Sequence, residues 1–206
     1  MSTAIKRVAV FGGAFDPFHN GHVAAVRLLL SDPSISQVII VPSGERPDKQ
    51  GVSKATERLE MTRLGVQAVF GGDPRVAVSD VQSTGAVGFA TIDLITYLRG
   101  TSSDQIEVVI GHELLKDLGV WHRADELKVM AHFLVLTRPG EVTSEPPPGW
   151  HVTFLPPFGA QGVDISSTAL RARLASGDIC QGLLPDVVRD YCRSRMLYQR
   201  HCGRIC

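Results

Sequence analysis

Residues 8–22, with the sequence VAVFGGAFDPFHNGH, constrain the fold of this chain more than any other stretch. Residues 8–11 form a short apolar run that is rich in β-branched side chains and stops at a pair of glycines, which is typical of an interior parallel strand. Gly12 and Gly13 predict a sharp turn at which the backbone can approach a ligand closely. The apolar residues that follow predict a helix over about residues 20–30.

Two histidines stand at the predicted start of this helix. His19 just precedes the first turn and His22 lies in it, so their spacing of three places them on neighbouring sides of one helix end. That end carries free backbone N–H groups and the positive pole of the helix dipole, and it commonly binds phosphate. The pair could instead be half of a zinc site, but neither a cysteine nor a third histidine lies nearby at ligand spacing. The whole stretch therefore favours a phosphate site.

The rest of the chain alternates predicted strands with predicted helices. Further strands are expected at residues 38–41, 75–80, 106–110, 132–137 and 151–155, and further helices at 56–70, 88–98, 124–130, from Ser166 or Ser167 onward, and at 184–191. This alternation predicts an α/β fold with a parallel sheet that is covered by helices on both faces. Ligands of such sheets bind at the carboxyl ends of the strands, near the point where the strand order reverses. We expect one domain over residues 1–198 and a short C-terminal tail over residues 199–206.

Composition narrows the class of protein. The chain has 206 residues, of which 44% are hydrophobic, so it can bury a sizeable core in a single domain. Its formal net charge is zero, which argues against a general nucleic-acid or membrane-surface binder. We find no signal peptide and no apolar run that could span a bilayer, and we expect a cytoplasmic protein. The four cysteines all lie within residues 180–206 and are expected to be free thiols.

A second motif, DISSTALR, occupies residues 164–171. Ser166 or Ser167 can cap the helix that follows, and the free N–H groups at that helix end suit the same kind of ligand as the first motif. Arg171 lies one turn beyond Ser167 and Thr168, so its guanidinium can reach back to a phosphate.

The string G-G-x-F-D-P-x-H-x-G-H, from Gly12 to His22, closely resembles the signature of nucleotidyltransferases with a Rossmann-like, doubly wound fold. Within that superfamily the chain is most similar to the bacterial nicotinate-nucleotide adenylyltransferases, and the similarity extends to about Tyr198. The resemblance implies transfer of an adenylyl group from ATP to nicotinate mononucleotide, which gives deamido-NAD and pyrophosphate in NAD biosynthesis. It also implies that His19, His22 and Arg171 are the catalytic residues.

The resemblance implies an ATP site that extends beyond the two motifs. Where the family usually reads Pro-His-Lys, this chain reads Pro47-Asp48-Lys49, so Lys49 remains a candidate phosphate contact while Asp48 replaces a possible cation with an anion. Where the family has Gly-x-Asp beside the ribose, Gly111 and Glu113 keep a carboxylate acceptor with a longer reach. The expected ATP-binding residues are Gly12, Gly13, Phe15, His22, Lys49, Gly111, Glu113, Ser166, Ser167, Thr168 and Arg171.

The resemblance also implies an acceptor site. The family typically has Ser-Tyr-Thr with the threonine beside the pyridine ring, and this chain has Phe89-Ala90-Thr91, so Thr91 is kept while the other two differ. Thr91 could equally cap a helix. Trp121 matches the ring that stacks on the nicotinate base, although it could also be a core aromatic. The expected acceptor-binding residues are Phe15, Asp16, Thr91, Trp121, His122 and Arg138.

The partners follow from the same reaction. We expect ATP and a mononucleotide as substrates, neither nucleic acid nor membrane as a partner, and leave a homo-oligomer open. Mg²⁺ is expected to be held mainly through the ATP phosphates rather than by protein ligands. Alternatives that stay open are another acceptor (nicotinamide mononucleotide, phosphopantetheine, or a polyol phosphate with cytidylyl transfer) and a nucleotide-binding regulator without catalysis.

Overall fold

A six-stranded sheet forms the centre of the computed structural model, which describes residues 6–45, 52–102, 104–138, 140, 144–157 and 165–199. The strands are β1 (Arg7–Gly13), β2 (Ile35–Pro42), β3 (Val76–Val78), β4 (Gln105–Gly111), β5 (His132–Leu136) and β6 (His151–Phe154). Their order is β3-β2-β1-β4-β5-β6, and every neighbouring pair is parallel. The predicted doubly wound, Rossmann-like sheet is therefore confirmed, and the strand order reverses between β1 and β4.

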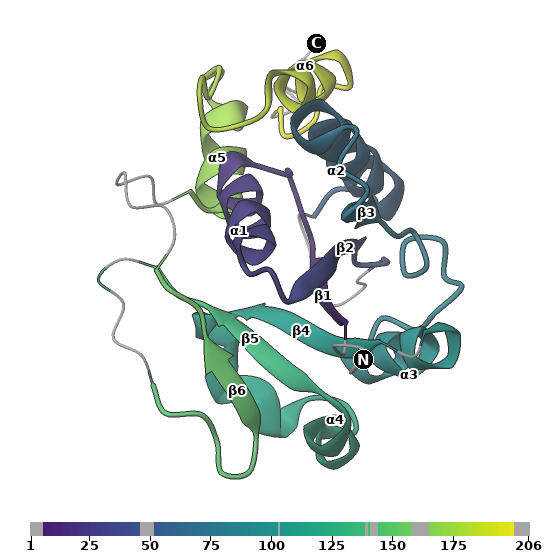
Figure 1. Cartoon of the computed structure of the whole chain (residues 1–206). Coiled ribbons are helices and arrows are strands. Elements are labelled where there is room, and N and C mark those ends of the chain that lie inside the picture. Colours follow the sequence, from purple (N-terminus) through teal and green to yellow (C-terminus); the bar gives the residue numbers. More distant parts are fainter. Residues whose placement is uncertain are drawn as a thin grey trace.

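Helices cover both faces of this sheet (Figure 1). They are α1 (Asn20–Ser31), α2 (Ala55–Phe70), α3 (Thr91–Thr101), the 3₁₀ helix η1 (His112–Val120), α4 (Ala124–Met130), α5 (Ser167–Ala175) and α6 (Asp186–Ser194). α1 and α2 pack on one face, and α3, η1 and α4 pack on the other. α6 lies against α2, and α5 lies beside α1 (Figure 1).

The core follows from the two-residue period of the strands. On β1, Val8 and Val10 point into the cluster beneath α3 and η1, whereas Ala9 and Phe11 point into the cluster beneath α1 and α2. β4 and β5 alternate in the same way between the two clusters. Because both faces of each central strand are buried, the strands read in the sequence as nearly continuous apolar runs.

The structure differs from the sequence-based expectations at several elements. β2 (Ile35–Pro42) is longer than the predicted residues 38–41, and α6 (Asp186–Ser194) is shifted from the predicted residues 184–191. The third strand is shorter than the predicted residues 75–80, because only Val76–Val78 pair with β2 at the edge of the sheet. The helix expected from residue 88 begins at Thr91, with Ala90 as its N-cap, so Thr91 is the first helical residue and not the cap. The 3₁₀ helix η1 was not predicted from the sequence.

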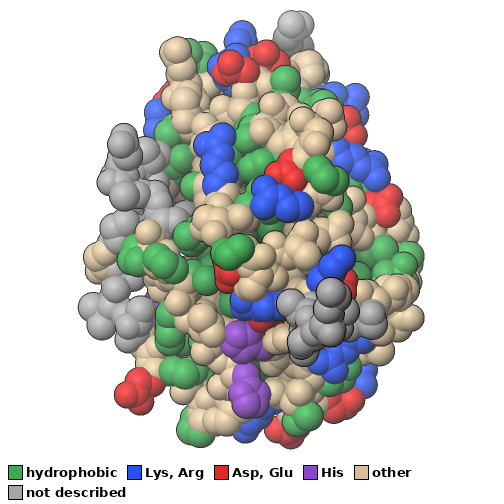
Figure 2. Space-filling view, in the orientation of Figure 1, with side chains coloured by type: hydrophobic (Ala, Val, Ile, Leu, Met, Phe, Trp, Pro, Cys, Tyr) green, Lys and Arg blue, Asp and Glu red, His purple; other side chains and the backbone are tan. Residues whose placement is uncertain are grey.

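The surface carries both signs of charge. On the face drawn in Figure 2, Lys and Arg side chains lie among Asp and Glu side chains and form no extended patch of one sign. Within the described ranges, no helix is both long enough and apolar enough to cross a membrane.

Candidate active site

A cavity of about 970 Å³ opens at the carboxyl ends of β1 and β4, where the strand order reverses. This volume is near the top of the usual range for ligand sites, roughly 300–1,000 Å³. Thirteen of the expected site residues line it: Gly12, Gly13, Phe15, His19, His22, Thr91, Gly111, Glu113, Trp121, His122, Arg138, Ser166 and Ser167. Asp16, Thr168 and Arg171 are not among the lining residues, and Lys49 falls outside the described residues.

Gly12 and Gly13 do not form the sharp turn that the sequence predicted. Both belong to β1, and the left-handed backbone conformation falls instead on Phe15, with a φ of 52°. A Cβ at Gly13 would lie 3.0 Å from the Phe15 ring, so the ring would have to shift, while a Cβ at Gly12 would meet nothing within 4 Å. Gly12 therefore leaves open space in the cavity wall, and Gly13 admits the ring that closes the wall behind it.

His19 and His22 form a stacked pair at the start of α1. Their ring centroids are 3.6 Å apart and the planes are tilted by 20°. His19 is the N-cap of α1, as expected, and a Cβ at Gly21 would lie 3.0 Å from its ring, so a glycine at that position makes room for the stack. The prediction that the two imidazoles share one helix end is confirmed.

A backbone hydrogen bond fixes the tautomer of His22. Its Nδ1 accepts the N–H of His19 at 3.1 Å, so Nδ1 carries no proton. In the neutral ring the proton is therefore on Nε2, which becomes a hydrogen-bond donor. Among the described residues, Nδ1 of His19 is the buried side-chain nitrogen without a hydrogen-bond partner. The pair thus retains hydrogen-bonding capacity beside the cavity.

Both imidazoles are held in the neutral form. Burial is the main cause that lowers the pKa of His19 to about 3, and the positive charge of the nearby Arg138 guanidinium acts in the same direction. Burial also lowers the pKa of His22 well below its ordinary value, with additional contributions from His19 and Arg138. The free protein therefore presents two neutral rings, backed by one permanent cation, at the end of α1.

The second motif closes the same end of the cavity. Ser166 is the N-cap of α5, and its hydroxyl accepts the N–H of Ala169 at 3.2 Å, which confirms the expected cap. Ser166 and Ser167 line the cavity together with Ile165. The N-terminal ends of α1 and α5 therefore meet at one place, and both carry the positive pole of a helix dipole.

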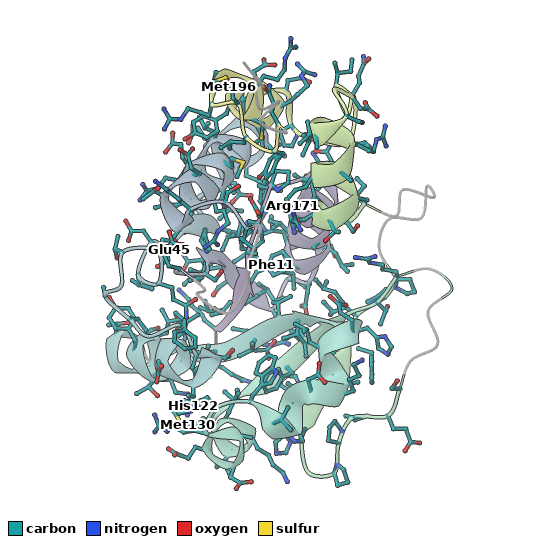
Figure 3. All side chains as sticks on the ribbon, turned by 180° about the vertical axis from the view of Figure 1, so that it is seen from behind. Phe11, Glu45, His122, Met130, Arg171 and Met196 are labelled. Carbon is teal, nitrogen blue, oxygen red and sulfur yellow. The ribbon has the colours of Figure 1, made fainter. Side chains whose placement is uncertain are left out.

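Arg171 links the second motif to the first. It points from α5 towards the body of the molecule (Figure 3), where Nη1 donates to the backbone oxygen of Asp16 at 2.9 Å and Nη2 to the hydroxyl of Thr168 at 3.2 Å. A guanidinium has five N–H donors, so these bonds leave others for a ligand. Asp16 itself is fully buried, which separates it from direct contact with an acceptor.

The opposite end of the cavity is apolar. Trp121 lies at the end of η1 and is partly buried, with its ring 6.3 Å from Phe133 in an edge-on arrangement. Thr91 begins α3 beside it in the cavity lining, and Phe89 projects at the rim with 66% of its surface exposed. Trp121 therefore serves as a core aromatic on one side and as part of the cavity wall on the other. This end can hold a flat, weakly polar ring.

Comparison with known proteins agrees with this architecture. A family model described as cytidylyltransferase-like matches residues 10–173. The chain belongs to the cytidylyltransferase-like family. The matched span includes the histidine pair, the apolar end of the cavity and the start of α5.

Full-length relatives narrow the family membership of this cytidylyltransferase-like chain. It is 33% identical to "Probable nicotinate-nucleotide adenylyltransferase" of Laribacter hongkongensis, over 96% of this chain and 97% of the relative. It is 32% identical to the protein of the same name from Herpetosiphon aurantiacus, over 94% and 99% of the two chains. The solved Plasmodium falciparum nicotinic acid mononucleotide adenylyltransferase, in complex with NaAD, shares 19% identity and a TM-score of 0.75, covering 94% and 97%. The resemblance noted in the sequence is confirmed.

Arg58, a residue outside the expected site set, also shapes the site of this family member. Arg58 is buried in α2, where Nε donates to the backbone oxygen of Ser53 and the two Nη atoms donate to Ala14, Ser43 and Gly44. These partners lie in the loops after β1 and β2, so Arg58 fixes the two loops relative to each other. Its local sequence reads as an ordinary helical segment, and no signal in it reveals these distant acceptors.

Metal ligands are scarce in the described part of the chain. No group of three or more His, Cys, Asp or Glu side chains is placed there to hold a metal ion. Glu113 carries the only carboxylate among the described residues that line the cavity. Such a lining suits a cation that arrives with its own anionic ligands better than one held by a protein cage.

Proposed function

We propose that this protein transfers an adenylyl group from ATP to nicotinate mononucleotide and releases pyrophosphate. One observation carries the proposal: a stacked pair of neutral histidines at a helix N-terminus faces a cavity that has an apolar, tryptophan-lined opposite end. The helix N-terminus suits phosphates, and the apolar end suits a pyridine ring. The full-length relatives named as nicotinate-nucleotide adenylyltransferases support the same reaction.

The reaction needs positioning and charge stabilisation more than a nucleophilic side chain. An oxygen of the acceptor phosphate attacks the α-phosphorus of ATP, and the bond from that phosphorus to the bridging oxygen of pyrophosphate breaks. His22 Nε2–H donates to a phosphate oxygen as charge redistributes. The N-terminal dipoles of α1 and α5, with the remaining N–H groups of Arg171, stabilise the departing pyrophosphate.

Donor groups at the apolar end decide which acceptor is used. A carboxylate only accepts hydrogen bonds, whereas an amide also donates, so backbone N–H groups near Thr91 and Trp121 would favour nicotinate over nicotinamide. Mg²⁺ bound through the ATP phosphates would offset part of their negative charge. The single carboxylate of Glu113 in the cavity lining is consistent with a metal held by phosphate and water.

A pyrophosphate-release assay tests the proposal. ATP and CTP are each offered with nicotinate mononucleotide, nicotinamide mononucleotide, phosphopantetheine and a polyol phosphate. We expect the highest kcat/KM for ATP with nicotinate mononucleotide. A higher value for CTP or for another acceptor would reassign the substrates within the same chemistry. Nucleotide binding without turnover in any combination would identify a regulator instead.

A further inference from the structure

Asp16 is buried completely in the middle of the first motif, yet it does not line the cavity. Its Oδ1 accepts a hydrogen bond from the hydroxyl of Tyr198 at 2.6 Å. Its Oδ2 accepts the backbone N–H of Ser53 at 3.0 Å. Its backbone oxygen accepts Nη1 of Arg171 at 2.9 Å. One residue therefore joins four segments of the chain that are far apart in the sequence.

The residues around Asp16 show which parts of the site depend on its position. Phe15 precedes it and forms part of the cavity wall, with its ring 4.8 Å from the ring of His22. Arg171 is oriented by its bond to the Asp16 carbonyl and also lies 3.9 Å from the carboxylate. A shift of Asp16 would therefore move the wall, the histidine pair and the guanidinium together.

Tyr198 is suited to hold this carboxylate. Burial raises the pKa of its phenol, and the charge of Asp16 raises it further, so the hydroxyl keeps its proton and donates. The same oxygen lies 3.7 Å from Sδ of Met61 in α2, which seats the phenol against a buried side chain. Removing one hydrogen-bond donor from a buried carboxylate costs free energy, so the hydrogen bond between Tyr198 and Asp16 is strongly favoured.

We propose that Asp16 and Tyr198 are positioning residues for the transfer reaction, which together form a brace between the C-terminal segment and the phosphate-facing loop. The proposal rests on the proposed adenylyl transfer. Neither side chain touches substrate. The brace keeps Phe15, His22 and Arg171 in the arrangement that aligns the acceptor phosphate with ATP.

Tyr198→Phe in the full chain tests the brace, because it removes one hydroxyl and leaves the ring. Tyr191→Phe is the matched control: the Tyr191 hydroxyl donates to the Glu57 carboxylate at 2.7 Å, between α6 and α2 and away from the cavity. We expect Tyr198→Phe to lower kcat by about 10- to 100-fold, because small displacements of reacting groups have effects of this size. The KM for nicotinate mononucleotide should change less than about twofold, because its ring is bound at the other end of the cavity.

A second measurement, amide hydrogen exchange, tests the brace without depending on catalytic turnover. Amide hydrogen exchange of residues 14–18 should become about tenfold faster in Tyr198→Phe and stay unchanged in Tyr191→Phe. Equal effects of the two substitutions on kcat or on exchange, or no effect of either, would overturn the brace. A wild-type protein that shows no transfer would refute the proposed function, and the exchange measurement would still decide whether the brace exists.

Asp16→Asn is the alternative test of the brace if Tyr198→Phe is not recovered as a folded protein. The amide keeps the size of the side chain but places an NH₂ group against one of the two donors of Asp16. We expect the same fall in kcat and the same faster exchange at residues 14–18. Wild-type values for this folded variant would overturn the brace.

Discussion

Lowering the pH from 7 to 5 should destabilise this protein through His19. The pKa of His19 is about 3 in the fold, against an ordinary value of 6.5 in the unfolded chain. Between these values the unfolded state binds the proton and the folded state does not. The stabilisation is therefore complete above pH 6.5 and is lost as the pH falls towards 3. At pH 5 the pH is 1.5 units below the pKa of the imidazole in the unfolded chain. The free energy of unfolding is therefore lower by about 2 kcal/mol than above pH 6.5.

Urea unfolding of the wild type and of His19→Asn at pH 7 and pH 5 measures this effect. Asparagine does not titrate and is a good N-cap, so α1 keeps its start. The variant differs from the wild type only in lacking this imidazole. We expect the wild type to lose about 2 kcal/mol more than the variant on going to pH 5. With a slope of about 2–3 kcal/mol per molar urea, the midpoints should separate by about 0.7–1 M.

Equal losses of stability in the two proteins would refute this reasoning. They would mean that His19 takes up its proton in the fold at an ordinary pH. Burial, or the charge of Arg138, would then not control the ring, and the mechanism could not assume a neutral pair.

Three further outcomes concern catalysis. His22→Ala should lower kcat by about 10²–10³, because one positioned donor to the phosphates is lost, and a folded variant within a few-fold of wild type would remove His22 from the mechanism. Arg171→Lys should weaken apparent ATP binding, slow turnover, or both, since an ammonium cannot replace a planar fork; unchanged steady-state kinetics would remove Arg171 from the phosphate site. Nicotinate mononucleotide should have a higher kcat/KM than its amide, and Trp121→Ala should raise its KM; an unchanged KM would end the stacking role.

The local parts of the site could be predicted from the sequence. The strand, the helix start and the histidine pair all lie within residues 8–22, where spacing alone determines which side chains meet. Ser166 was predicted as a cap for the same reason, because its partner is three residues away. The alternation of strands and helices was sufficient to predict the parallel sheet.

The long-range parts could not be predicted. Tyr198 and Asp16 are 182 residues apart, and Arg58 and Ala14 are 44 residues apart. No periodicity connects such pairs, so the sequence carries no signal for the contacts that enclose Asp16, which the resemblance places in the acceptor site. The 3₁₀ helix η1 also left little signal, because its buried Leu115 and Leu118 follow a three-residue turn rather than the 3.6-residue period.

The bond between Tyr198 and Asp16 also sets an order of assembly during synthesis. The ribosome adds about 5–20 residues per second, so Asp16 exists for roughly 10–40 s before Tyr198 is made. All six strands of the sheet are complete by residue 154, well before that moment. The nascent chain can therefore form its sheet first and acquire the finished geometry of its phosphate end last. During this interval a growing chain can hold a folded sheet while the segment around Asp16 still lacks its bond to Tyr198.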